Sequence, residues 1–423
     1  MELPYELEEL VLGYLVGDTS ALRNCSLTCR RFTPISQRIL FARVEFSLSD
    51  EYIHRQPERF RFLILSSPHI ADLVTGVSII DNRYHIMAPA IQFHGDTHLP
   101  ECLPILINLR NLSLEGKGFS TLLWSSVSSR MKGTLESIFW SMTNISLYRI
   151  VDIPPPVFAG CIALESLSLE FVSFIKDVPP KKSTKKIPDN ARTRLKSLRL
   201  TLPDQGYQDV ANWFTDPACP LDISGLLKLS ATMTLEYYDH GHVAKLLNAC
   251  AQSLEIFCFS PTFKGKPINK KYKENFFPHS SVSAGPHPTA LNPIDLSCFP
   301  RLRILRLRTG LAITPKHLHH PKFHLWMHDV VSQLRNSTSI QEISIKSSLL
   351  MELEKGLSKF SMLPWNPVDE VLITLSSLRR VTFLVASNEL GLSPPILRKF
   401  GKGFANLSSC GILSVRAADG KSS

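Results

Sequence analysis

Residues 302–308, LRILRLR, decide the fold, because their apolar positions follow the order Leu-x-x-Leu-x-Leu. In an extended chain alternate side chains point to the same face, so Leu305 and Leu307 face one side while the arginines between and after them face the other. A strand of this kind buries one face only, and it needs neighbouring strands and a covering layer. The stretch therefore predicts one strand of a half-buried sheet.

The same pattern recurs along most of the chain, with Ile, Val, Phe, Trp or Cys in place of some leucines. Repeats of this kind are typical of a solenoid, in which each strand is followed by a connection that returns to start the next parallel strand. The copies are Val74/Val77/Ile79, Leu109/Leu112/Leu114, Leu135/Ile138/Trp140, Leu164/Leu167/Leu169, Leu195/Leu198/Leu200, Leu254/Phe257/Phe259, Leu302/Leu305/Leu307, Ile340/Ile343/Ile345, Leu378/Val381/Phe383 and, more weakly, Leu226/Leu229/Ala231 and Leu407/Cys410/Ile412.

Helical patterns lie between several of these copies. Residues 242–254, 323–334 and 367–378 each place apolar side chains on one helix face. The alternation resembles long, irregular leucine-rich repeats and predicts an α/β fold, an irregular solenoid (horseshoe) of parallel strands and helices over residues 73–417. Residues 47–72 are expected to form a linker, and a helix within them is expected to cap the first strand. Residues 418–423 are expected to form a disordered tail.

The first 46 residues follow a different period. In LPYELEELVLGYL, residues 3–15, apolar side chains recur at helical spacing after Pro4. Asp18 or Thr19 can cap a second helix. A third helix is expected from Thr33 to Phe41. Three short helices bury too little surface to be stable alone, and units of this size are usually completed by a metal, a disulfide or a partner.

Cys25 and Cys29 raise the question of a metal or redox site in this segment. A zinc site needs further ligands at matching spacing, and none follows in the segment. We interpret both as compact apolar side chains beside Leu22 and Phe32. The nine cysteines of the chain are an odd number and are scattered, which is typical of a reducing compartment. A partner remains as the expected source of stability.

The stretches LPYELEELVLGYL, SALRNCSLTCRRF and RILF together resemble the F-box, the adaptor-docking module of Skp-cullin-F-box ubiquitin ligases. The resemblance implies that residues 1–46 form a three-helix F-box that docks on a Skp-type adaptor and through it on a cullin. Phe32 and Phe41 stand where many F-boxes carry tryptophan. The positions implied to fill the small core or to contact the adaptor are Leu3, Pro4, Leu7, Leu10, Val11, Leu15, Cys29, Phe32 and Phe41.

A solenoid of this kind presents exposed strand residues that can hold another protein. With the F-box, it implies a substrate-recognition subunit of a ubiquitin ligase. The alternative is a leucine-rich-repeat scaffold that acts outside any ligase, at nucleic acid or in the nucleus through its basic loops. Arginine side chains on the exposed face favour an acidic or phosphorylated client, although such positions can also be ordinary solvated ones. The candidate client contacts are Arg199, Arg306, Arg308, Ser344 and Lys346.

The formal net charge of +10 is concentrated in two basic insertions, near residues 177–194 and 262–297. We interpret them as solvated loops, with nuclear import or phosphate binding as the alternative. No nucleic-acid-binding motif accompanies them, so a nucleic-acid partner is not expected. The acidic start of the chain and the lack of a long apolar window predict neither a signal peptide nor a membrane partner. We expect a cytoplasmic or nuclear location.

The sequence has no phosphate-binding loop, nucleophile elbow, His-Glu-x-x-His helix or cluster of carboxylates. The protein is therefore not expected to be an enzyme or to bind a cofactor. His320, His324 and His328 recur every four residues and could line one helix face for a transition metal. Since no carboxylate or cysteine completes the set, we interpret this face as solvated and expect no metal.

Overall fold

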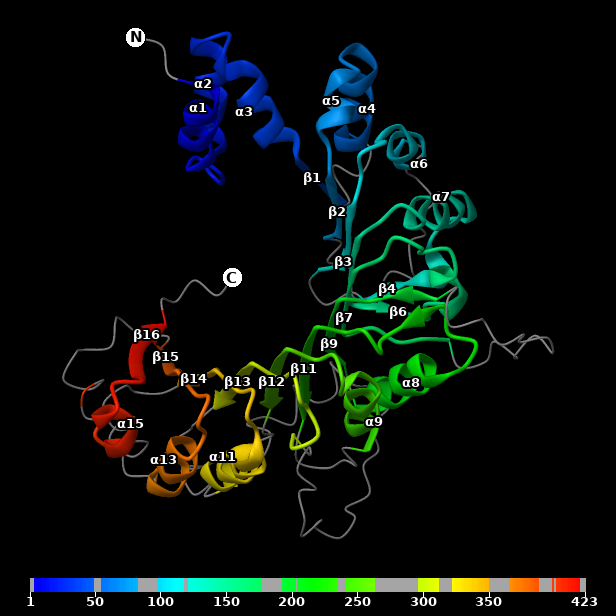
Figure 1. Ribbon diagram of the computed structural model, residues 1–423. Helices are drawn as coiled ribbons and strands as arrows, with labels where there is room; N and C mark the ends of the chain where they lie inside the picture. Colours follow the sequence, from blue (N-terminus) through cyan, green and yellow to red (C-terminus); the bar gives the residue numbers. More distant parts are fainter. Residues whose placement is uncertain are drawn as a thin grey trace, which may run out of the picture. The chain divides into compact units, whose positions relative to one another are not determined.

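The computed structural model describes residues 4–48, 55–82, 98–117, 121–175, 192–202, 204–234, 241–262, 296–311, 322–349, 365–387, 398 and 401–418. Helices and parallel strands alternate along the chain, which confirms the expected α/β class. The chain forms two compact units (Figure 1). Unit 1 comprises Met1–Leu195 with Pro217–Asp222, and unit 2 comprises Lys196–Asp216 with Ile223–Ser423.

Unit 1 begins with three helices, here called the N-terminal helices: α1 (Tyr5–Gly13), α2 (Thr19–Thr28) and α3 (Phe32–Phe41). A parallel sheet of β1 (Arg43–Leu48), β2 (Gly76–Asp81), β3 (Asn111–Gly116), β5 (Asn144–Tyr148) and β7 (Ser166–Glu170) follows, paired in that order. Its connections hold α4 (Arg55–Ser66), α5 (His69–Leu73), α6 (Leu99–Cys102), η1 (Leu103–Ile105), η2 (Trp124–Ser126), α7 (Ser129–Phe139) and η3 (Pro155–Phe158). Two short parallel pairs complete the unit: β4 (Leu122–Leu123) with β6 (Ile150–Val151), and β8 (Thr193–Arg194) with β10 (Leu221–Asp222).

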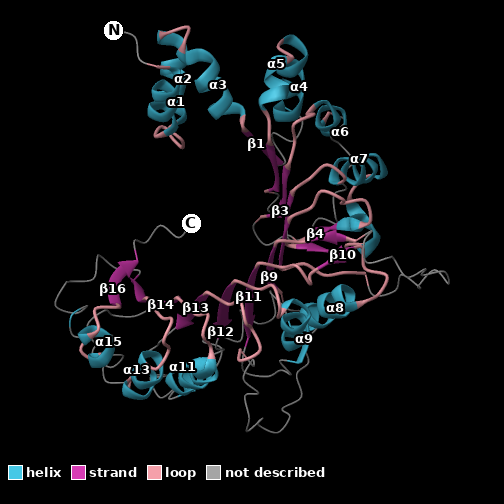
Figure 2. Cartoon of the chain, viewed as in Figure 1, coloured by secondary structure: helices cyan, strands magenta, loops and turns pink. Residues whose placement is uncertain are grey.

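Unit 2 carries a second run of parallel strands. They are β9 (Ser197–Thr201), β11 (Lys228–Thr234), β12 (Ile256–Thr262), β13 (Ile304–Leu311), β14 (Glu342–Leu349), β15 (Arg380–Ser387) and β16 (Leu413–Ala418), paired in that order. The helices between them are α8 (Asp204–Thr215), α9 (Gly241–Cys250), α11 (Lys322–Ser332), η5 (Gln333–Asn336), α13 (Asn366–Ile373) and α15 (Ala405–Ser409). In each unit the helices that connect successive strands lie along one side of the strands (Figure 2).

The core of each unit is a set of rows in which apolar side chains of neighbouring strands stand opposite one another. In unit 1, Val77, Leu112, Ile145 and Leu167 form one such row, and each is at most 3% exposed. Burying a side chain of this size contributes roughly 1.5–3 kcal/mol before ordering costs. Unit 2 continues the same arrangement with the buried residues Leu198, Leu229, Phe257, Leu305, Ile343 and Val381.

The expected helix patterns between strands are confirmed where the structure describes their side chains. In α9, the residues Val243, Leu246, Leu247 and Cys250 are buried on one face. The buried faces of α11 and α13 carry Met327, Val330, Val368, Val371 and Leu372. These faces cover the apolar rows of the strands, as an amphipathic helix must.

Two copies of the repeat pattern were placed wrongly. Leu135 and Ile138 lie on α7, and Trp140 follows that helix with 62% of its surface exposed. The strand of this repeat is β5, whose buried residues are Ile145 and Leu147.

The second misplaced copy lies near the end of the described chain. Leu407 lies on α15 and Cys410 is exposed. The strand is β16, where Leu413 pairs with Val381 and Val415 with Phe383.

A strand also occupies the place where the sequence predicted the start of a linker. β1 begins at Arg43 and pairs with β2 through Leu48, so the boundaries at residues 46 and 47 fall inside a strand. The segment expected to hold a capping helix contains α4, where Phe60 and Ile64 are buried. Phe60 packs edge-on against Phe46 of β1, with ring centroids 5.4 Å apart. Unit 1 therefore joins the N-terminal helices to the first strands without a separate linker.

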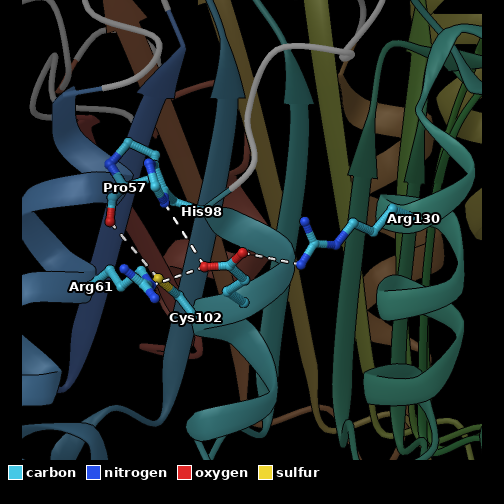
Figure 3. A network of polar contacts seen from close by, with 6 residues as sticks. Pro57, Arg61, His98, Cys102 and Arg130 are labelled. Atoms are coloured by element: carbon cyan, nitrogen blue, oxygen red, sulfur yellow. Dashed lines mark hydrogen bonds and ion pairs between the residues drawn. The ribbon is translucent and has the colours of Figure 1, made fainter.

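A polar network on α6 joins the helices that cover unit 1 (Figure 3). Glu101 Oε2 lies 2.9 Å from Arg61 Nε of α4, and Glu101 Oε1 lies 3.1 Å from Arg130 of α7. His98 Nδ1 lies 3.9 Å from the same carboxylate. Both arginines are partly exposed, so these ion pairs contribute little to stability.

The predicted insertions and tail lie almost entirely outside the residues that the structure describes, as does most of the segment before α11. Among the helices that it does describe, none has the length and apolar character needed to span a membrane.

Candidate protein-interaction surfaces

The N-terminal helices are positioned by local signals that the sequence carries. Pro4 precedes α1, and its carbonyl accepts hydrogen bonds from the N–H groups of Leu7 and Glu8 at 3.0 and 3.1 Å. Asp18 Oδ1 accepts the N–H of Ala21 at 2.9 Å and caps α2, as expected. α3 begins at Phe32, one residue before the expected Thr33, and ends at Phe41.

α2 ends at Thr28, so Cys29 lies just beyond that helix. Cys29 is extended and starts the turn into α3. Thr33 Oγ1 donates to the carbonyl of Ser26 at 2.8 Å and ties the two helices together. Cys25 and Cys29 are both half-buried free thiols.

The core of these three helices is small. Leu12, Leu22 and Ile35 are each at most 2% exposed. Glu8 is also buried at 5%, and its Oε1 lies 3.3 Å from a side-chain nitrogen of Arg31. Leu12 and Glu8 are one turn apart on α1, so they define the face of that helix that packs inward.

The longest apolar stripe of α1 faces solvent. Leu7, Leu10, Val11 and Tyr14 are 45%, 56%, 56% and 82% exposed, and they recur at i, i+3, i+4 and i+7. We call these four residues the exposed stripe. At 100° per residue it lies about a third of a turn away from the inward face. Leu27 of α2 is 85% exposed as well.

The predicted adaptor positions divide into two groups. Pro4, Leu7, Leu10 and Val11 are exposed, whereas Leu15, Cys29, Phe32 and Phe41 are half-buried, and Leu3 lies outside the described residues. Sequence reasoning missed Leu12 and Glu8 as inward residues and Leu27 as an exposed one. The apolar period on α1 fits two faces, and the face that packs inward carries Leu12 and Glu8, whose contact with Arg31 no local pattern reveals.

The predicted client contacts lie on the sheet face opposite the apolar rows. Arg306 of β13 stands opposite Ser344 of β14, and Arg308 stands opposite Lys346. These four residues, here called the basic face, therefore form one group on two neighbouring strands. Arg199 is exposed on β9, with β11 and β12 between it and Arg306, so it does not join the group.

The basic face continues onto β16. In register, Lys346 pairs with Leu384 of β15, and Leu384 pairs with Arg416. Arg416 Nε donates to Ser414 Oγ at 3.0 Å. Arg416 was not among the predicted contacts, because the pattern predicted this strand too early in the chain. Like charges at directly opposed strand positions repel, so an anion bound between Arg308 and Lys346 would be stabilised.

Among the described residues, no group of three or more His, Cys, Asp or Glu side chains lies close enough together to hold a metal ion. His328 Nδ1 lies 3.5 Å from Asp329 Oδ1. His320 and the side chain of His324 lie outside the described part of the chain.

Comparison of the chain with models of known protein families finds no match, and comparison with curated proteins finds none either. The two surfaces are therefore interpreted from their own chemistry.

Proposed function

We propose that this chain is the substrate-recognition subunit of a Skp-cullin-F-box type ubiquitin ligase. In this role the N-terminal helices are an F-box that docks on a Skp-type adaptor, and the strand repeats are leucine-rich repeats that hold a client protein. The chain itself supplies proximity, because the client is held near the enzyme that transfers ubiquitin.

The observation that carries the proposal is the exposed stripe on α1. A helix in a free-standing unit turns its apolar stripe toward its own core, but here Leu10 and Val11 are each 56% exposed while Glu8 is buried. Large contiguous apolar surfaces mark interaction sites. Burial of four such side chains under a partner gains several kcal/mol before association costs.

The adaptor interface is tested by co-expression with a Skp-type adaptor and purification through a tag on the adaptor. The variant L10D/V11D is expected to reduce recovery of this chain at least tenfold, because two carboxylates would be desolvated in the interface. The matched control is Phe62→Asp on α4, since Phe62 is 73% exposed but lies outside the N-terminal helices. Equal recovery of the L10D/V11D variant and the unaltered chain would rule out adaptor docking through the stripe.

A truncation gives a second test. It should begin at Arg43, because β1 starts there and pairs with β2. The truncated chain is expected to lose the adaptor while keeping its strand repeats. Retention of the adaptor by this truncated chain would count against an F-box at the N-terminus.

The client class follows from the basic face. Arginine and lysine side chains on two neighbouring strands suit carboxylate or phosphate groups, with Arg binding such oxygens in pairs. We therefore infer an acidic or phosphorylated client segment, bound at Arg306, Arg308, Ser344 and Lys346.

A further inference from the structure

Three consecutive turns of unit 1 are each closed by the same kind of backbone hydrogen bond, from the fourth residue of the turn to the first. The N–H of Leu109 donates to the carbonyl of Leu106 at 3.0 Å, and the same bond joins Met142 to Phe139 at 3.2 Å and Leu164 to Cys161 at 3.3 Å. The first and last residues of all three turns are buried. The turns lead directly into β3, β5 and β7, which are adjacent and in register.

The second residue of each turn is large, apolar and exposed. Ile107, Trp140 and Ile162 are 67%, 62% and 77% exposed. The three turns have equivalent hydrogen bonds and lead into adjacent strands. Their second side chains therefore lie side by side in a line across the strands. We call them the apolar row. Isolated exposed apolar residues are common, but three in register form a continuous patch.

The turn itself does not require an apolar residue at this position. The same hydrogen bond closes turns at Val74, Leu226, Leu302 and Leu378. Their second residues are Asp72, Ser224, Pro300 and Ser376. The apolar row is therefore a property of the sequence of three neighbouring repeats and is not imposed by the fold.

Trp140, at the centre of the row, rests on a glycine. A Cβ added to Gly160 would lie 1.8 Å from Trp140 Nε1 and 2.2 Å from Trp140 Cδ1. Any side chain at position 160 would thus displace the indole. The glycine allows the indole to lie against the backbone, which holds an exposed aromatic side chain in one place. Preordered Trp side chains of this kind dominate many protein interfaces.

A second line of residues runs beside the row and carries opposite charges at its two ends. The N–H of Thr143 donates to the carbonyl of Arg110 at 2.8 Å, and the N–H of Glu165 donates to the carbonyl of Thr143 at 2.9 Å. Arg110 follows Ile107 by three residues, and Glu165 follows Ile162 by three. Both charged residues are exposed.

We propose that the apolar row is the centre of a twofold interface between two copies of this chain. Consider a twofold axis that passes by Trp140, lies in the plane of this surface and is perpendicular to the row. It turns the second copy over and exchanges the two ends of the row. Ile107 then meets the partner's Ile162, and Trp140 meets the partner's Trp140. Arg110 meets the partner's Glu165. The apolar row is thus symmetric about Trp140, and the line beside it carries opposite charges at its two ends. An isologous interface requires this kind of self-complementarity.

The size of the row sets the strength of this dimer. Three side chains that are about two-thirds exposed supply on the order of half of the roughly 800 Å² per partner in a standard interface. The dimer is therefore at the small end of specific interfaces, and its population depends on concentration. Its opposed charges make it weaken as salt rises.

Sedimentation equilibrium of the full chain over a concentration series tests the proposal. Trp140→Ser is expected to raise the dimer dissociation constant at least tenfold, and Gly160→Ala is expected to raise it by displacing the indole. The matched control, Phe62→Ser, removes an equally exposed aromatic outside the row and should leave the constant unchanged. The stripe variant L10D/V11D should leave it unchanged too, which separates this interface from the proposed adaptor site.

Charge exchange identifies the partner as a second copy of the same chain. Arg110→Glu and Glu165→Arg should each weaken the dimer, because each places like charges opposite one another. The double variant R110E/E165R should recover it within about twofold. A chain that stays monomeric at all concentrations, a dimer abolished by the stripe variant, or a double variant as weak as the singles would overturn the proposal.

Discussion

At the scale of single residues, Cys161 and Cys250 act as apolar groups. Burial raises the pKa of each thiol to about 12, and the Cys250 thiol donates to the carbonyl of Leu247 at 3.4 Å. Only the thiolate is a nucleophile or a metal ligand, so both residues are chemically inert at neutral pH. Cys161 opens the turn that presents Ile162, which gives it a packing role.

The raised thiol pKa values predict a loss of stability in alkali. The ordinary pKa is 9.0, so above pH 9 the unfolded chain releases thiol protons that the folded chain keeps up to about pH 12. The free energy of unfolding should therefore be insensitive to these thiols below pH 9 and fall between pH 9 and 12. Urea unfolding from pH 7 to 10.5 measures the slope, which should be shallower in C161A/C250A. An unchanged slope in that variant would show that other groups cause the loss.

At the scale of elements, Asp369 joins two helices through their backbones. It is 2% exposed on α13, and its two carboxylate oxygens accept the N–H groups of Asn406 and Leu407 at 2.9 and 3.0 Å. These N–H groups begin α15 and have no partner within the helix. The carboxylate thus fixes α15 against α13, next to the buried ring of Phe404.

Asp369→Asn is expected to lower the free energy of unfolding by about 1–3 kcal/mol, because the amide offers one acceptor oxygen and leaves a buried N–H without a partner. The matched control is Glu370→Gln, the exposed neighbour, which should change it by less than about 0.5 kcal/mol. Urea unfolding followed by circular dichroism gives both values. Equal stabilities of the two variants would show that the contact with α15 contributes nothing.

The misplaced strands show how far a repeat pattern can be read from sequence. The spacing Leu-x-x-Leu is also the i, i+3 spacing of a helix face, and Leu135 with Ile138 satisfies both. In the true repeat Met142 takes the first apolar position before β5, and methionine was not among the accepted types. The copy at Leu302, Leu305 and Leu307 was placed correctly, because Arg306 and Arg308 alternate with the leucines, whereas apolar Phe139 stands between Ile138 and Trp140.

The candidate surfaces were harder to predict from the sequence than the strands. The stripe of α1 could be found by its period, but the face that packs inward includes Glu8, which contacts Arg31 just before α3. The apolar row could not be found, because Trp140 was assigned to a strand. Both failures have one cause: the periodic pattern gives the spacing of residues along an element, whereas their exposure depends on contacts with distant parts of the chain.

At the scale of the whole molecule, the exposed strand faces of the two units differ in charge. In unit 1 that face carries the serine ladder Ser78, Ser113, Ser146 and Ser168, and beside it Glu115 and Glu170 accept hydrogen bonds from Ser113 and Ser168. In unit 2 the corresponding positions include the basic face and Arg416. Part of the net charge of +10 therefore lies on the basic face and Arg416, in addition to the part in the two insertions.

This distribution predicts that the basic face binds acidic segments. Fluorescein-labelled poly-glutamate, followed by anisotropy, should bind the full chain with an affinity that falls as salt rises. Arg306→Glu with Arg308→Glu should raise the dissociation constant at least tenfold, because both reversed charges lie beside Lys346. The matched control, Arg335→Glu with Lys402→Glu, makes the same change in net charge at exposed positions outside the basic face and should alter binding less than twofold. If the control weakened binding as much as R306E/R308E, net charge would be the cause and the basic face would have no special role.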